Sequence, residues 1–290
     1  MHSPRDIRRR IKSVSSTAQI TKAMQMVAAS KMRKAQQAAL NGRPFAALLY
    51  RLQRKATRQA VDFSHPLLEA REVRKRAVIL IAGDKGLCGA LNSNLFRLAA
   101  QFDPQTTLFI TAGRRAAQYI ARTRRQLVAE FAYGDSPRYS EAKAIAACAR
   151  DLFLKGEVDQ VQVVATRFIN TLTQEPICLE FLPVGAITGL KLPGALTEEE
   201  LTASTAEYLF EPSAESFLGY LLSHYLSIYI YQVLLNAKAS EQSARMVAMK
   251  NATDNANTLI KDLTLEYNKL RQGKITTELL EIVGGQIGAS

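Results

Sequence analysis

The C-terminal part of the chain carries an unbroken helical pattern. Between Glu211 and Ile287, apolar or small residues recur at alternating spacings of three and four positions, from Tyr225 to Leu270. A seam sustained over so many heptads is typical of a coiled coil rather than of a helix within a globular core. At 1.5 Å per residue, about seventy helical residues reach on the order of 100 Å. A compact domain of this chain length is only about 35–40 Å across, so the pattern predicts a helix that extends beyond it.

A second long helix is predicted near the N-terminus, from Arg5 to Leu40. Pro4 stands where a helix can begin, and Gly42 with Pro44 marks its far end. A further helical segment is expected from Phe45 to Val61. Because the two long helices lie at opposite ends of the chain, we expect them to pack antiparallel as a coiled coil.

The seams of the two helices face each other in this arrangement. We predict an alignment of the two helices that sets small residues on one seam against larger residues on the other, as close packing prefers. It pairs Thr21 with Met249 and Ala18 with Thr253; a register displaced by one heptad gives bulkier layers. The predicted seam residues are Ile7, Ile11, Val14 and Met32 in the first helix and Leu235, Met246, Met249, Ile260 and Leu263 in the second.

The residues between the two helices have a different pattern. Ala77–Ala82 is a continuous apolar run of strand length, which predicts a strand covered on both faces. Strands then alternate with helices, which predicts an α/β domain with a largely parallel sheet. The further strands are expected at Thr107–Thr111, Val128–Tyr133, Val161–Thr166 and Ile177–Leu182, and the helices at Asn92–Gln101, Arg114–Arg124 and Tyr139–Leu154.

The predicted fold is therefore an α/β protein built on a long antiparallel coiled coil. A Rossmann-like α/β domain, residues 74–205, is inserted between an N-terminal helical segment, residues 1–60, and a C-terminal one, residues 208–290. The stretch Pro183–Thr205 is rich in Gly, Pro and Thr, and we expect it to be a loop. No run of eighteen apolar residues occurs, which argues against a membrane-spanning helix.

Positive charge is concentrated in the N-terminal helical segment. Residues 1–60 hold fourteen Lys and Arg against the single acid Asp6, an excess that accounts for the net charge of +12 of the 290-residue chain. This pattern fits a solvated helix face. It also fits an acidic partner, which could be a nucleic acid or an acidic protein surface. Cys88, Cys148 and Cys178 lack metal-ligand spacing and are expected to be reduced thiols of a cytosolic protein.

Candidate chemistry is sparse. The glycine-rich turn Gly83–Gly89 follows a strand and precedes a helix, as a phosphate-binding loop does, but Lys-Ser or Lys-Thr does not follow its last glycine. We interpret it as a tight turn, with phosphate binding as the alternative. Cys88 within it is expected to be buried rather than nucleophilic. No acid/base pair, catalytic triad or metal cluster is evident, so we expect no catalytic residue, no metal and no cofactor.

Four sequence blocks then carry a resemblance. They are Ile20–Met32 (ITKAMQMVAASKM), Asp84–Asn92 (DKGLCGALN), Ala239–Met249 (ASEQSARMVAM), and Tyr267–Gln272 (YNKLRQ) with Ile275, Thr276 and Glu278. Together, and in this order, they resemble the gamma subunit of F-type ATP synthases. The blocks extend from one end of the chain to the other.

The resemblance implies a non-catalytic rotor. In that family the two terminal helices form a coiled coil inside a hexamer of alternating alpha and beta subunits, and the foot of the subunit sits on the membrane-embedded c-ring. It also implies an epsilon subunit as a partner and an acidic beta-subunit loop as the partner of the basic helix. By resemblance, Met24, Arg245, Arg271, Gln272, Thr276 and Glu278 contact the hexamer, and Tyr208, Phe210 and Glu211 contact the c-ring.

The resemblance also implies a location and leaves two alternatives. The N-terminus has no apolar leader or transit peptide, which favours a bacterial subunit held at the cytoplasmic face of the inner membrane through the c-ring.

A nucleic-acid-binding coiled coil would explain the basic N-terminus, but aromatic residues are not interleaved with its charges. A nucleotide-dependent enzyme would explain the α/β domain, but the glycine-rich turn lacks the determinants for phosphate. We therefore expect no nucleic-acid partner.

Overall fold

A computed structural model of the chain describes residues 3–42, 45, 65–184 and 214–287. Its contacts divide the chain into two compact units. The first combines Met1–Ala28 with Met246–Ser290, and the second is Ala29–Arg245. The division cuts through both long helices. Their inner parts, from Ala29 onward in the first helix and up to Arg245 in the second, are grouped with the α/β segment, and their outer parts form the first unit. The sequence had suggested three consecutive segments.

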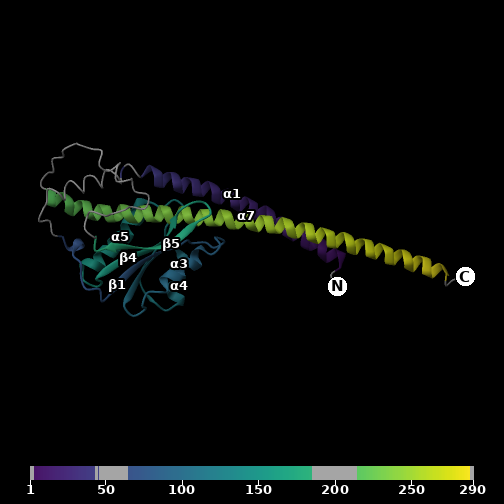
Figure 1. Ribbon diagram of the computed structural model, residues 1–290, viewed down its shortest axis with the longest axis horizontal. Coiled ribbons are helices and arrows are strands. Elements are labelled where there is room, and N and C mark those ends of the chain that lie inside the picture. The colour runs from purple at the N-terminus through teal and green to yellow at the C-terminus, as the bar shows by residue number, and fades with distance from the viewer. Residues whose placement is uncertain (1–2, 43–44, 46–64, 185–213, 288–290) are drawn as a thin grey trace. The chain divides into compact units, whose positions relative to one another are not determined.

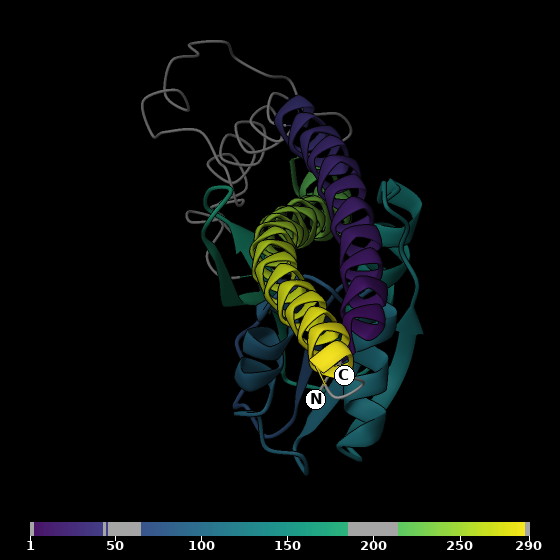
Figure 2. The same ribbon diagram turned by 90° about the vertical axis from the view of Figure 1, so that its right-hand side faces the viewer.

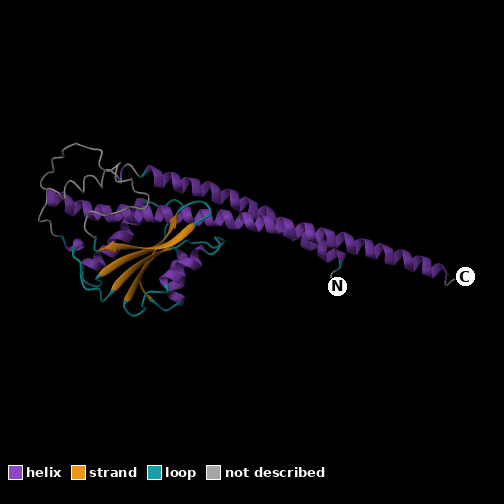
Figure 3. Ribbon diagram, in the orientation of Figure 1, coloured by secondary structure: helices purple, strands orange, loops and turns teal. Residues whose placement is uncertain are grey.

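The second unit contains a five-stranded sheet (Figure 3). The strands follow the order β3-β2-β1-β4-β5; β1 pairs in parallel with β2 and β4, β2 pairs in parallel with β3, and β5 is antiparallel to β4. The prediction of a largely parallel sheet is confirmed. The strands are β1 (Arg76–Ile81), β2 (Thr107–Ala112), β3 (Gln126–Phe131), β4 (Gln160–Phe168) and β5 (Gln174–Leu182).

Helices cover both faces of this sheet (Figure 1). Ala77, Ile79 and Ile81 of β1 belong to a core formed with α5 (Tyr139–Leu154) and the inner part of α7 (Ala214–Ile287). Val78 and Leu80 belong to a separate core formed with α3 and α4. Alternate side chains of β1 thus enter different cores, which explains its continuous apolar run. The other elements on the sheet are α3 (Leu91–Ala99), α4 (Arg114–Arg122) and the short 3₁₀ helix η1 (Pro66–Leu68).

Helix α7, with 74 residues, changes character along its length. From Leu218 to Gln242 most of its side chains are buried, whereas beyond Met246 burial is confined to one stripe. Among the described residues, only the stretch Phe217–Thr277 contains a window apolar enough to cross a membrane, with a mean hydropathy of 1.2. Since 72% of that window is buried inside the protein, packing against the sheet accounts for its apolar character.

The first unit consists of the outer parts of two helices, α1 (Pro4–Asn41) and α7, which lie side by side and run in opposite directions (Figure 2). The predicted seam residues of this unit are buried to different extents. Ile7, Met249 and Leu263 are buried, whereas Ile11, Val14, Met246 and Ile260 are half-buried. The remaining two seam residues, Met32 and Leu235, are buried in the second unit.

The predicted register of the helix pair is wrong by one helical turn. The hydroxyl groups of Thr21 and Thr253 lie 2.7 Å apart and share a hydrogen bond. The sequence had paired Thr253 with Ala18 and Thr21 with Met249. The two buried hydroxyls satisfy each other, and this polar match outweighs the size matching on which the prediction was based.

Several predicted segments fall outside the described residues. They are the helical segment after Phe45, the Pro183–Thr205 loop from residue 185 onward, and the predicted c-ring contacts Tyr208, Phe210 and Glu211.

Candidate functional site

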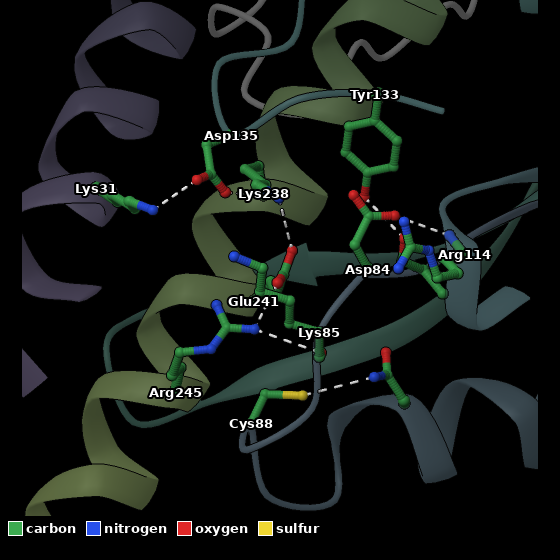
Figure 4. Close-up of polar contacts among 12 residues, drawn as sticks. Lys31, Asp84, Lys85, Cys88, Arg114, Tyr133, Asp135, Lys238, Glu241 and Arg245 are labelled. Carbon is green, nitrogen blue, oxygen red and sulfur yellow. Dashed lines mark hydrogen bonds and ion pairs between the residues drawn. The ribbon is translucent and has the colours of Figure 1, made fainter. Parts of the chain in front are cut away.

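Three charged residues interrupt the buried part of α7. Lys238, Glu241 and Arg245 are spaced three and four positions apart, which places them on one face of the helix. Their side chains are only 3%, 3% and 9% exposed. Charges this deeply buried are costly unless each is paired, so their partners define the candidate site (Figure 4).

Glu241 lies at the centre of this group. One oxygen of its carboxylate accepts a hydrogen bond from Lys238 Nζ at 3.0 Å, and the other accepts one from Arg245 Nη2 at 2.6 Å. The carboxylate also packs directly against the backbone of Gly83. A Cβ built on Gly83 would lie 2.7 Å from Glu241 Cδ, which is too close for an ordinary contact. Glycine at this position therefore permits the close approach of the two segments.

Arg245 joins α7 to the turn that follows β1. Its guanidinium donates to the carbonyl oxygen of Gly86 at 3.2 Å and to that of Lys85 at 3.4 Å. The same turn is held from its other side, because Asp84 Oδ1 accepts the backbone N–H of Arg114 at 2.8 Å, at the start of α4. The turn thus packs against α4 and α7 together. The carboxylate of Glu241 lies against Gly83 as well, so on this side the turn is occupied by contacts with its own chain.

Cys88 is buried at the end of this turn, as expected. Asn92 Nδ2 donates to its sulfur at 3.6 Å. Burial raises the pKa of the Cys88 thiol, although the nearby Arg245 acts in the opposite direction. A thiol held in its neutral form is a poor nucleophile.

Asp135, in the loop after β3, links the site to both long helices. Its carboxylate accepts a hydrogen bond from Lys31 Nζ of α1 at 2.5 Å and lies 3.3 Å from Lys238 Nζ of α7. The hydrogen bond from Lys31, supported by Lys238, lowers the pKa of Asp135 to about 2.

Tyr133, two residues before Asp135, is buried as well. Burial raises the pKa of Tyr133 well above its usual value, so its hydroxyl stays protonated and donates to Ala82 O at 3.0 Å.

The contact residues inferred from the resemblance are not brought together by the structure. Arg271, Gln272 and Thr276 are exposed on the outer part of α7, and Met24 is half-buried on α1. The side chain of Glu278 is outside what the structure describes. Arg245 differs from the others, because its guanidinium is occupied by groups of its own chain.

Sequence reasoning missed Lys31, Asp135, Lys238 and Glu241. A signal for two of them was present, since Lys238 and Glu241 stand three apart directly after residues 216–237, which include no Lys, Arg, Asp or Glu. Asp135 gave no such signal, because its partner Lys31 is 104 positions away in the sequence.

Two histidines also have structural partners. His65 Nδ1 accepts the backbone N–H of Leu67 at the start of η1, and His224 shares a hydrogen bond with the hydroxyl of Tyr139. Within the described part of the chain, no three His, Cys, Asp or Glu residues are arranged to hold a metal ion. The arrangement around Glu241 joins segments and contains no group placed for bond-making chemistry.

Comparison with known proteins gives one consistent result. Residues 3–287 match the ATP synthase family. The ATP synthase gamma chain of Opitutus terrae is 47% identical over 294 residues, with 100% of both chains covered. That of Methylacidiphilum infernorum is 44% identical, with 99% of both covered.

Solved structures agree on the fold. A chain of the central stalk and c-ring of the Tetrahymena thermophila mitochondrial ATP synthase superimposes with a TM-score of 0.59 at 27% identity, over 80% of this chain and 99% of that one. A rotor chain of the Euglena gracilis mitochondrial ATP synthase gives a TM-score of 0.62 at 18% identity, over 94% and 98%. The family match over residues 3–287 and the full-length relatives at 44–47% identity show that the chain belongs to the ATP synthase gamma chain family.

Proposed function

We propose that this chain is the rotating central shaft of an F-type ATP synthase. It couples the flow of protons or sodium ions through the c-ring to conformational change in the catalytic beta subunits, and it contributes no catalytic residue. Family membership supports this role.

The observation that carries the proposal is the surface of the two helices outside their seam. Apolar side chains remain exposed on α1 and on the outer part of α7. Exposed apolar residues in such number indicate a surface that partners cover. They include Ile20, Met26 and Val27 on α1, at 53–61% exposed, and Leu265, Ile275, Leu279 and Leu280 on α7, at 48–70% exposed.

The partners follow from this role. The alpha and beta subunits surround the outer helix pair, with Met24, Arg271, Gln272, Thr276 and Glu278 at the contact. The basic face of α1 meets acidic groups of the beta subunits. Tyr208, Phe210 and Glu211 meet the c-ring, the epsilon subunit binds alongside, and nucleic acid has no part. The subunit is held at the cytoplasmic face of a bacterial inner membrane indirectly, through the c-ring.

Reconstitution tests the proposal. The purified chain alone should not hydrolyse ATP. Alpha and beta subunits, assembled with the chain, epsilon and the membrane sector in vesicles, should pump ions when ATP is added. Assembly without the chain should abolish pumping. ATP turnover by the rigorously purified chain, or ion pumping that does not depend on it, would overturn the proposal.

A further inference from the structure

The charged residues around Glu241 form one continuous path. In order along it, Lys31, Asp135, Lys238, Glu241 and Arg245 alternate in sign, and each neighbouring pair lies within 2.5–3.3 Å. The path starts on α1, crosses the loop after β3, follows α7 and ends on the carbonyl oxygens of the turn after β1. It therefore joins four segments of the second unit that are distant in sequence.

Each carboxylate on this path is shared between two cations. Asp135 lies between Lys31 and Lys238, and Glu241 lies between Lys238 and Arg245. A displacement of any one segment would leave a charge without its partner. For the three α7 residues the unpaired charge would be buried, which is strongly unfavourable. The segments are thus held in one relative position.

Stability alone does not account for this arrangement. A buried ion pair is often no more stabilising than well-packed apolar residues of the same volume, because removing the charges from water costs as much as their attraction returns. An apolar side chain at residue 238 could fill the same space. What charges add is direction, since hydrogen bonds to Asp135 and Glu241 fix orientation in a way that apolar contacts do not.

We propose that Glu241 and Lys238 are positioning residues of a rigid joint. This joint fixes the inner parts of α1 and α7 to the turn after β1 and the loop after β3. The proposal rests on the shaft function above. In that role, torque must pass between the α/β segment and the helices without slippage, and this joint transmits it. Arg245 then contributes through the turn that it holds.

Substitutions at Lys238 separate orientation from packing. Lys238→Met keeps the length of the side chain and removes its charge, while Asp135 retains Lys31 and Glu241 retains Arg245. Lys238→Arg keeps a cation between the two carboxylates. We expect the methionine variant to assemble but to move several-fold fewer ions per ATP hydrolysed, and the arginine variant to stay close to the original ratio.

A steric variant tests the joint without altering any charge. Gly83→Ala adds a methyl group that would lie 2.7 Å from Glu241 Cδ and so displaces the carboxylate or the turn. It should reproduce the loss seen with Lys238→Met. The control for the charge removed by Lys238→Met is Glu175→Gln on β5, whose partner Arg167 lies at 2.6 Å in a pair that is half exposed on the same sheet. It should change nothing.

The experiment measures two quantities on each variant. In vesicles containing the whole complex, ATP hydrolysis and ion pumping are recorded together. In the purified chain, amide hydrogen exchange is followed across the turn after β1 and the loop after β3. We expect Lys238→Met and Gly83→Ala to accelerate exchange in both segments and to lower the pumping ratio.

The outcomes distinguish this joint from the proposed function. Unchanged exchange in both variants would overturn the joint itself, whatever the complex does. Faster exchange with a normal pumping ratio would overturn its role in transmission. Failure of the unaltered chain to support pumping would instead refute the shaft function, and the exchange result would still decide whether the joint exists.

Discussion

Thr21 of α1 and Thr253 of α7 share a hydrogen bond of 2.7 Å inside the helix pair. Each hydroxyl also lies within hydrogen-bond distance of a carbonyl oxygen of its own helix, Ala18 O for Thr21 and Met249 O for Thr253. Because each hydroxyl has a single proton, one threonine donates to its own helix while the other donates across the seam. This contact fixes which residues of the two helices lie opposite each other.

The first prediction concerns this register. Moving one turn along each helix from the threonine pair brings Ala18 opposite Ala256. After replacement of the three native cysteines, cysteines at these two positions should oxidise efficiently, because disulfides form readily when the Cα atoms lie within about 7 Å. The comparison pair is Ala18 with Thr253, which the seam pattern alone had favoured. Faster cross-linking of the comparison pair, followed by gel mobility, would contradict the observed register.

The second prediction concerns the threonine pair itself. Thr21→Val or Thr253→Val should each lower the free energy of unfolding by about 0.5–1.5 kcal/mol, because the hydrogen bond across the seam is lost. The double variant should cost less than the sum, since two valines in contact leave no polar group unsatisfied. Urea unfolding followed by circular dichroism measures all four proteins. Additive losses would show that the two hydroxyls do not interact.

The third prediction concerns Asp135 and pH. Its pKa of about 2 in the folded chain is below the value of 3.8 for a free side chain, so folding favours the ionised form. The resulting stability is present above about pH 4 and is lost as the pH falls towards 2. Because the side chain is 46% exposed, solvent screening limits the contribution to about 1 kcal/mol or less.

Asp135→Asn provides the measurement. The variant should be less stable than the original chain at pH 6 and should differ from it progressively less between pH 4 and pH 2. Glu175→Gln serves as the control for a half-exposed pair that does not involve α1 or α7. A difference in stability that is constant across this pH range would mean that the Asp135 charge is not responsible.

The strands and helices could be predicted because their patterns are local. The β1 run predicted a strand with two buried faces, and alternate residues of that strand do enter separate cores. The register could not be predicted in the same way. Small and large residues along the seams match almost equally well when one helix shifts by a turn, and the hydrogen bond between Thr21 and Thr253 reveals the actual position.

The charged site shows a different limit. The sequence block around Arg245 is one of the four that together carry the family resemblance, but a motif does not reveal whether a side chain faces a partner or its own chain. The guanidinium turns inward because Glu241, four positions earlier, is buried and needs a counter-charge. Asp135 could not be assigned at all, since its contact with Lys31 depends on the tertiary fold.

The fourth prediction concerns the exposed part of α7. Arg271→Ala should weaken binding of the chain to the alpha and beta subunits several-fold, because a cation at the proposed contact is lost, while the melting temperature of the isolated chain stays the same. Arg97→Ala on α3, which removes another exposed cation, should leave binding unchanged. Binding can be measured by titration of a fluorescent label. Equal affinities for the two variants would remove Arg271 from the proposed contact.

Rotation is the most direct test of the account as a whole. Alpha and beta subunits assembled with this chain would be fixed to a surface, and a bead would be attached through a cysteine at the exposed Ser136, with the native cysteines replaced. On addition of ATP the bead should turn continuously in one direction, and it should still turn when Ala18 and Ala256 are joined by a disulfide, since the helices move as one body. ATP hydrolysis by these complexes without any rotation of the bead would contradict the account.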